Sequence, residues 1–218
     1  QQQRLVQDAS HELRTPLTSL RVNVEMLDRI ERSTAEISAE DRAAVLDAIA
    51  SEVAELGSLF DELIDLATDS DDRDAPLELV RLDEIVTRAV ARWAQRTDRS
   101  IDVTVEAVTV NGNDALLERA VTNLIGNAHK FSPPDEPIEV VVRDGFVAVR
   151  DGGPGIPAAD RERVFDRFHR AETTRSMPGS GLGLAIVAKI VDHHGGEVWA
   201  AESDRGGADV GFTLPVVS

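Results

Sequence analysis

In the first third of the chain the apolar positions recur every three or four residues, as they do in helices that pack along a seam. From Leu13 onward the spacing alternates between four and three, which is typical of a coiled coil or a helical bundle. A second helix with the same spacing begins after Ser38, which we expect to be its N-cap, with Asp41 placed as in a capping box. The seam positions are Leu13, Leu17, Leu20, Val24 and Leu27 in the first helix and Val45 or Leu46, Ile49, Val53, Leu56, Phe60 and Leu63 in the second. The pattern predicts an all-α helical hairpin over residues 1–69.

Two apolar seams in one hairpin predict a partner for it. One hairpin cannot bury both seams well, so dimerisation into a four-helix bundle is favoured. The alternative is a hairpin that packs on the rest of its own chain. Pro16 lies inside the first helix, where a proline removes a backbone hydrogen bond and predicts a bend.

Beyond residue 76 the periodicity changes. Residues 69–76 are acidic and end in Pro76, which predicts a linker at 70–76. Strands are expected at 77–82, 101–107, 108–110, 138–143, 146–150, 197–202 and 208–216, and helices at 83–96 with Asp83 as N-cap, 114–131, 158–165 and from 181 or 182 to 194. Asp144-Gly145 is a hairpin turn signal. Because helices and antiparallel strands alternate without a regular βαβ rhythm, residues 77–218 predict an α+β sandwich, with helices on one face of a mixed sheet.

Composition narrows the function classes. The net charge of -17 argues against nucleic acid as a partner, because phosphate backbones are bound by basic surfaces. Without cysteine, the chain has neither disulfides nor thiolate metal sites. No apolar run approaches the length of a membrane span. The chain opens in a helical pattern without an N-cap, so we expect a helix cut from a longer parent.

The first helix carries a cluster of reactive side chains. His11, Arg14 and Thr15 share one helical face, and Glu12 lies beside them. Taken alone, this cluster is more typical of a solvated polar stripe on a helix. The other histidines, His129, His169, His193 and His194, lack metal-ligand spacing and are expected at the surface or at helix ends.

Three segments of the second domain have the composition of a nucleotide site. Asn123 and Asn127 lie one turn apart on an apolar helix, although asparagine is a poor helix former, and amide oxygens suit Mg²⁺. Asp151 follows a strand and opens a glycine-rich turn, where a carboxylate can accept from an exocyclic amine. The segment 179–187 places glycines before a helix N-terminus, which favours phosphate. Alternatively, the amides are buried and satisfied, and the glycines serve only turns.

The stretch 166–178, with Phe165 and Phe168 at its start, predicts a mobile lid over a nucleotide, or alternatively an inert surface loop. Together, five motifs in this order resemble the cytoplasmic core of a sensor histidine kinase of a two-component system. The resembling motifs are His11 to Leu17 (phospho-acceptor box), Asn123 to Phe131 (asparagine box), Asp151 to Gly155 (first glycine box), Phe165 to Arg170 (phenylalanine box) and Gly179 to Leu184 (second glycine box).

The resemblance implies a dimerisation and phosphotransfer hairpin followed by a Bergerat-type ATP-binding domain, with ATP and Mg²⁺ as ligands. It implies autophosphorylation of His11 and transfer to an aspartate on a response regulator receiver domain. By the same resemblance, Asn127 holds Mg²⁺, Asn123 and Lys130 meet phosphate, and Asp151 binds the adenine amine. The residues implied to shape the remaining pocket and lid are Phe131, Gly153, Gly155, Ile156, Phe168, Arg170, Gly179, Ser180, Gly181, Leu182, Gly183 and Leu184.

Two positions depart from the family pattern. Phe131 stands where tyrosine is common, which keeps base stacking and loses a hydroxyl. Gly152 stands where asparagine is frequent. The resemblance also implies a homodimer that forms the cytoplasmic part of a cell-membrane sensor, with any membrane segment outside this chain.

At the chemical step, Glu12 is expected to orient the neutral His11 imidazole and to act as base, and Thr15 to orient water in a second, dephosphorylating activity. One alternative is a degenerate nucleotide-binding scaffold without kinase activity. Another is an ATPase of the gyrase, Hsp90 or MutL type, which would lack the His-Glu-x-x-Thr-Pro helix.

Overall fold

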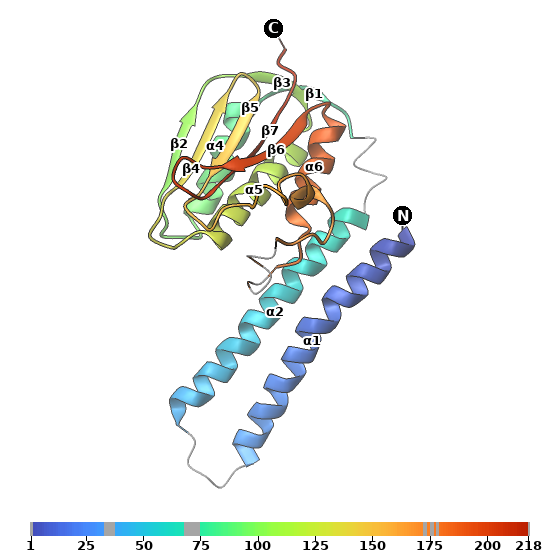
Figure 1. Cartoon of the computed structure of the whole chain (residues 1–218), viewed down its shortest axis with the longest axis vertical. Helices are drawn as coiled ribbons and strands as arrows, with labels where there is room; N and C mark the ends of the chain where they lie inside the picture. Colours follow the sequence, from blue (N-terminus) through green and yellow to red (C-terminus); the bar gives the residue numbers. More distant parts are fainter. Residues whose placement is uncertain are drawn as a thin grey trace. The chain divides into compact units, whose positions relative to one another are not determined.

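The computed structural model describes residues 2–32, 38–67, 75–171, 174, 177 and 179–217. The chain divides into two compact units, a helical hairpin that ends at Ala67 and an α/β unit, and both are drawn in Figure 1. Across the described ranges, no helix is both long enough and apolar enough to cross a bilayer.

The hairpin consists of α1 (Gln2–Arg32) and α2 (Ala39–Ala67), two long helices that pack against each other (Figure 1). The predicted cap of α2 is confirmed, because the Asp41 N–H donates to Ser38 Oγ at 3.0 Å and Ser38 Oγ donates to Asp41 Oδ2 at 2.7 Å. Helix α1 continues through Pro16. The bend expected there stays a prediction.

The hairpin leaves much of its apolar surface uncovered. Leu59 is buried, whereas Val53 is 53% and Phe60 60% exposed. The large apolar side chains exposed on α1 and α2 are Leu17, Val22, Val24, Met26, Leu46, Val53, Phe60 and Ile64. A single hairpin therefore leaves several of the predicted seam positions exposed to water. Large exposed apolar patches are uncommon on monomeric soluble proteins.

The α/β unit is built on a five-stranded sheet in the order β2-β4-β5-β7-β6, with helices α4, α5 and α6 (Figure 1). The elements are β1 (Glu78–Arg81), α4 (Leu82–Ala94), β2 (Ile101–Val105), β3 (Thr109–Gly112), α5 (Asp114–Phe131), β4 (Ile138–Arg143), β5 (Phe146–Arg150), the 3₁₀ turn η1 (Arg163–Phe165), α6 (Gly183–His193), β6 (Glu197–Glu202) and β7 (Ala208–Thr213). Strand β2 is parallel to β4 and the other pairs are antiparallel, so the predicted mixed sheet is confirmed. The two-stranded sheet of β1 and β3 was not predicted.

The core lies between the sheet and the helices. Along β4, Ile138, Val140 and Val142 are fully buried and alternate with more accessible residues, which is the pattern of a strand with one covered face. The turn between β4 and β5 has φ of 48° at Asp144 and 77° at Gly145, as a tight hairpin turn requires. The predicted boundaries of α5, β4, β5 and β6 agree with the structure.

Two local predictions were wrong. Asp83 is not an N-cap, because α4 begins at Leu82 after Arg81. Instead, the Asp83 carboxylate accepts from the Arg81 guanidinium and from the Val108 N–H at 3.2 Å. The hydrogen bond from Arg81 holds the pKa of Asp83 below its usual range. Of the helix expected at 158–165, only the last three residues are regular, and they form the 3₁₀ turn η1.

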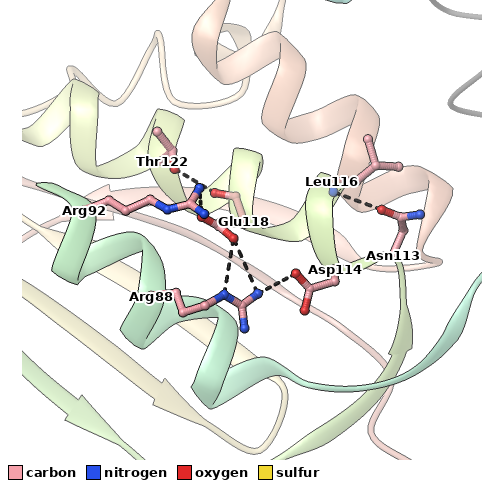
Figure 2. A network of polar contacts seen from close by, with 7 residues as sticks. All are labelled: Arg88, Arg92, Asn113, Asp114, Leu116, Glu118 and Thr122. Carbon is pink, nitrogen blue, oxygen red and sulfur yellow. Dashed lines mark hydrogen bonds and ion pairs between the residues drawn. The ribbon is translucent and has the colours of Figure 1, made fainter.

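An ion-pair network joins α4 to α5 (Figure 2). Glu118, only 8% exposed, accepts from Arg88 through Oε2 and pairs with Arg92 through Oε1. Arg88 also pairs with Asp114. The same helix is capped by Asn113, whose side chain accepts from the Leu116 N–H at 3.1 Å. These contacts fix the helix that carries the asparagine segment.

Candidate functional site

The predicted phospho-acceptor residues His11, Glu12 and Thr15 lie in α1. Their side chains are outside the described part of the structure. Nearby, Thr18 Oγ1 donates to the Arg14 carbonyl at 2.7 Å, which turns that hydroxyl back onto its own helix. A shallow groove along this stretch is lined by Leu13, Arg14, Leu17, Thr18 and Arg21.

Helix α5 brings its asparagines to the start of α6. Asn123 Nδ2 donates to the Arg119 carbonyl at 3.0 Å, so its Oδ1 faces away from that bond. A Cβ placed on Gly183 would lie 3.3 Å from Asn123 Oδ1. Asn127 is half-buried one turn further along α5. The asparagine and second glycine segments, more than fifty residues apart, therefore meet in the fold.

The first turn of α6 presents backbone amides. Leu182 is fully buried and fixes the start of the helix, and the first hydrogen bond within it runs from the Ile186 N–H to the Leu182 carbonyl at 2.9 Å. The amides of Gly183 and Leu184 precede that bond, as expected at a helix N-terminus. Such an end attracts negative charge, so this is the part of the site suited to phosphates.

Asp151 lies directly after β5 and is 6% exposed. Its Oδ1 accepts from the Gly153 N–H at 2.8 Å and from the Ala208 N–H at 3.2 Å. Burial raises the pKa of the Asp151 carboxyl, while these two backbone N–H groups act in the opposite direction. Since both donors use Oδ1, the second oxygen can accept a hydrogen bond from a ligand.

Glycines surround Asp151 because backbone atoms approach it closely. A Cβ on Gly153 would lie 2.6 Å from the Phe131 carbonyl oxygen and 2.9 Å from Asp151 Oδ1. A Cβ on Gly155 would lie 3.3 Å from the Gly207 carbonyl oxygen and 3.4 Å from that of Gly206. A side chain is excluded at Gly153 by these close contacts, whereas at Gly155 it would be strained by the φ of 71°. Ile156, just beyond, accepts through its carbonyl from Arg161 Nε at 3.2 Å.

Sequence reasoning missed the support that the β6–β7 turn gives to this site. A Cβ on Gly207 would lie 2.0 Å from the Asp151 carbonyl oxygen, and the Asp151 N–H donates to the Ala208 carbonyl at 3.0 Å. The signal in the sequence was the Gly206-Gly207 pair between two predicted strands.

Glu136 fills the place next to Gly152. A Cβ on Gly152 would lie 3.2 to 3.3 Å from Glu136 Cγ, Cβ and Oε2. The departure from the family pattern at Gly152 thus coincides with a carboxylate from the loop after α5. This contact was also missed.

At the C-terminal end of α5, Lys130 and Phe131 are half-buried, with Lys130 Nζ 5.2 Å from the Phe131 ring centroid. The Phe131 carbonyl reaches Gly153, as described above, so this end of α5 borders the Asp151 turn. A cation and an aromatic ring therefore lie at the edge of the site.

The described part of the predicted lid is closed at its base by backbone contacts. The Phe168 N–H donates to the Gly181 carbonyl at 3.0 Å, and both residues have positive φ, 60° and 71°. A Cβ on Gly181 would lie 2.8 Å from the His169 carbonyl oxygen. A positive φ is unfavourable for phenylalanine, so this base is a strained point. Arg170 donates to the carbonyls of Thr174 and Met177.

Gly179 and Ser180 also belong to the described residues, and Gly179 has φ 137°. The predicted lid, residues 166–178, also includes residues that the structure does not describe. The role of this segment as a lid stays a prediction.

A magnesium ion fits the donor set only as a partner of phosphates. Over the described residues, no group of three or more carboxylates and imidazoles is placed to hold a metal. One half-buried amide, Asn127, is available on α5. That suits Mg²⁺, which keeps several waters and binds together with substrate phosphates.

His194 lies at a helix end, as expected, because it is the C-cap of α6. It is buried, accepts from the Asn113 N–H at 2.9 Å through Nε2, and contacts the Ile190 carbonyl through Nδ1. Burial lowers the pKa of His194. His169, in the phenylalanine segment, pairs with Asp160 at 3.0 Å, and His129 packs on Trp93.

Two protein families match separate parts of the chain. Residues 1–71 match the His Kinase A (phospho-acceptor) domain family, and residues 112–218 match the histidine kinase-, DNA gyrase B- and HSP90-like ATPase family. The fold and its site thus define a phospho-acceptor hairpin joined to an ATPase domain of this type.

Relatives support the same assignment over the whole chain. The chain is 42% identical over 223 residues to the signal transduction histidine-protein kinase/phosphatase MprB of Mycolicibacterium vanbaalenii, covering 99% of this chain and 46% of the relative. It is 40% identical to the protein of that name from Mycobacterium avium, over 99% of this chain and 42% of the relative. The chain belongs to the sensor histidine kinases of two-component systems. It spans less than half the length of these curated relatives.

Solved structures agree. A mycobacterial sensor histidine kinase MprB structure is 38% identical, with a TM-score of 0.59 over 64% of this chain and 98% of that chain. The Acinetobacter baumannii histidine kinase AdeS has a TM-score of 0.66 over 95% of this chain and 98% of that chain. Because its identity is 22%, it supports the fold alone.

Proposed function

We propose that this chain is the catalytic core of a sensor histidine kinase, which phosphorylates His11 with ATP and passes the phosphoryl group to an aspartate of a response regulator. The observation that supports it best is the buried Asp151 carboxylate, held through one oxygen by two backbone amides, in a chain that also carries a phospho-acceptor domain. A carboxylate with its second oxygen unused suits the amine of adenine.

The same geometry supports a specific mode of nucleotide binding. Asp151 accepts from the adenine amine, and Phe131 lies against the base. The γ-phosphate end lies toward Asn123 and the first turn of α6, with Lys130 as a further cation. Asn127 would hold Mg²⁺ together with the phosphates, and the ion would supply positive charge that offsets theirs. Gly153, Gly155, Gly181 and Gly183 let chain segments pack closely around the site. Residues 166–178 would form the lid over the nucleotide.

At the chemical step, the lone pair of the neutral His11 Nε2 attacks the γ-phosphorus. The N–P bond forms, the bond from phosphorus to the bridging oxygen breaks, and ADP leaves. The Glu12 carboxylate accepts a hydrogen bond from the Nδ1–H group and offsets the positive charge that develops on the ring. Much of the rate comes from in-line positioning.

The uncovered apolar positions of α1 and α2 support a homodimer through the hairpin. Val53, Phe60 and Ile64 would be buried if two hairpins formed a four-helix bundle. The receiver domain of the regulator would bind beside His11, near the groove at Arg14 and Thr18. In this scheme residues 1–69 form the dimerisation and phosphotransfer domain, 70–76 the linker and 77–218 the ATP-binding domain. We place it on the cytoplasmic side of a membrane-anchored parent.

We also propose a regulator-directed phosphatase activity. The relatives are named kinase/phosphatase, and Thr15 lies one helical turn after His11, where its hydroxyl can orient a water. Thr15→Ala should spare autophosphorylation and slow dephosphorylation of a phosphorylated regulator. Equal loss of both activities would contradict the separation of roles.

The kinase proposal is tested with γ-labelled ATP and Mg²⁺. The wild-type chain should take up label that is lost in acid and kept in base, as a phosphoramidate is. His11→Gln should bind ATP and take up no label. A wild-type chain that binds ATP without labelling would instead favour the nucleotide-binding scaffold, and a His11→Gln variant that labels normally would move the acceptor elsewhere.

A further inference from the structure

Among the contacts of the described residues, one buried arginine beside the Asp151 turn has no carboxylate partner. Arg99, in the loop between α4 and β2, is only 9% exposed. Its guanidinium donates to three backbone carbonyls: Nε to Glu136 at 2.7 Å, Nη1 to His129 at 3.0 Å and Nη2 to Pro133. Buried charged side chains are normally paired with an opposite charge, so a buried arginine that donates to backbone carbonyls needs an explanation.

The three carbonyls belong to one segment, residues 129–136. His129 is in the last turn of α5, where carbonyls have no partner within the helix. Pro133 and Glu136 form the turn that follows, which is closed by the Glu136 N–H to Pro133 carbonyl bond at 3.1 Å. Arg99 therefore completes the end of α5 and pins the next turn to it, as a cation at a helix C-terminus can.

The pinned segment is a wall of the Asp151 site. Its Phe131 carbonyl abuts Gly153, at 2.6 Å from where a Cβ would stand. Its Glu136 side chain covers Gly152. A displacement of the segment would therefore move the edge of the turn that carries the Asp151 carboxylate.

Arg99 also acts on Asp151 through its charge. Burial raises the pKa of Asp151, and the positive charge of Arg99 opposes that shift. Arg99 is therefore a positive charge near Asp151. Among the described contacts, Arg99 makes no hydrogen bond to the Asp151 carboxylate. The ionisable side chains on the segments around Asp151 also include an ion pair next to it, since Arg150 Nε pairs with Asp209 Oδ2 at 3.0 Å. The others are Glu136, His129, Lys130, Asp204 and Arg205.

We propose that Arg99 is a positioning residue for the nucleotide: its fork holds residues 129–136 against the Asp151–Gly153 turn. It does not touch the ligand. The inference rests on the proposed role of Asp151 in binding adenine.

Two substitutions separate the fork from the charge. Arg99→Lys keeps the charge and cannot reach three carbonyls, whereas Arg99→Gln loses both. Arg96→Gln, at an exposed arginine just after α4, is the matched control. ATP dissociation constants of the full chain with Mg²⁺ are measured by calorimetry between pH 5 and 8, at a temperature where each variant is shown to be folded.

Loss of two carbonyl contacts should weaken ATP binding by Arg99→Lys about tenfold, with the wild-type dependence on pH. Arg99→Gln should bind still more weakly. Its affinity should also begin to fall at a higher pH, because a carboxyl without its cation takes up a proton sooner as the pH drops. Arg96→Gln should match the wild type. His129 also feels the charge of Arg99, so the titrations are repeated in a His129→Gln background.

Wild-type affinity in Arg99→Lys would overturn the positioning role of the fork. If Arg99→Gln does not fold, Arg99→Lys alone decides that point. Asp151→Asn separates this inference from the function it rests on. Unchanged ATP binding in Asp151→Asn refutes the nucleotide role itself, whereas weak binding there and normal binding in the Arg99 variants refutes only the positioning role.

Discussion

Replacing Asp151 with asparagine should weaken ATP binding while leaving the fold at least as stable at neutral pH. Asn is nearly the same shape, and its carbonyl oxygen can keep both hydrogen bonds that Oδ1 now accepts, from Gly153 at 2.8 Å and from Ala208 at 3.2 Å. The amide then occupies the place of Oδ2. A donor would face the adenine amine, which is itself a donor.

The size of the loss follows from the kind of bond that is removed. A hydrogen bond to a charged group contributes about 1.5–3 kcal/mol, and it is replaced here by two donors that face each other. ATP should therefore bind roughly 10- to 150-fold more weakly to Asp151→Asn. The burial of the site, with Asp151 only 6% exposed, keeps water from replacing the lost acceptor.

The effect on stability has the opposite sign. Burial raises the pKa of Asp151 in the folded chain, so the folded state binds more protons than the unfolded state between the ordinary pKa and the raised one. Stability therefore falls as the pH rises through that window, and above it the cost of the buried charge is complete. Asparagine has no charge to desolvate, so the variant avoids this cost at neutral pH.

The assay pairs calorimetric ATP titration with urea unfolding of the same samples at pH 7. Asp144→Asn is the control, because Asp144 is exposed in the β4–β5 turn and its φ of 48° suits asparagine. Weak ATP binding with unchanged or raised stability is the expected result. A variant that binds ATP normally, or one that loses binding and several kcal/mol of stability together, would refute the reasoning.

Three further changes test the support around the site. Gly207→Ala should destabilise the chain by about 3 kcal/mol or more in thermal unfolding, because its Cβ would lie 2.0 Å from the Asp151 carbonyl oxygen and no rotamer relieves that contact. Glu118→Gln should cost about 1 kcal/mol in urea unfolding, since its arginine partners are largely exposed, and the difference from wild type should shrink in 1 M salt. His194→Gln should remove part of the acid sensitivity of unfolding. Because the pKa of His194 is lowered in the folded state, the neutral ring contributes fully to the stability of the fold above about pH 6.5. That contribution is lost as the pH falls through the folded pKa. If the free energy of unfolding of the variant depends on pH below 6.5 as it does in the wild type, the prediction is contradicted.

Local signals predicted the elements well because their physical causes are local. Helix α5 runs over Asp114–Phe131 as expected, since Asn113 caps its start and Pro133 follows its end. The β4–β5 hairpin was predicted from Asp144-Gly145, the residue pair that tolerates two positive φ angles. The extra sheet of β1 and β3 was missed, because two short strands separated by a helix and another strand have no shared local pattern.

Long-range polar partners could not be predicted from the sequence. Asp83 has the residue type and position of a helix cap, yet it bonds Val108, 25 residues away. His194 stands at a helix end, yet its ring accepts from Asn113, 81 residues away. In both cases the sequence identifies a polar group near a helix terminus, and the tertiary structure decides which partner it finds.

The glycines of the Asp151 turn show why a motif does not specify how its residues act. At Gly153 a side chain is excluded by the Phe131 carbonyl, and at Gly207 by the Asp151 carbonyl, so backbone atoms that cannot move aside impose glycine at both positions. At Gly152 the neighbour is the Glu136 side chain, which can rotate away. The motif contains Gly152 and Gly153 side by side and does not contain Gly207. The rigid constraint on this site therefore comes from chain segments that meet only in the fold, the end of α5 and the β6–β7 turn, and it is those segments that hold the Asp151 carboxylate in place.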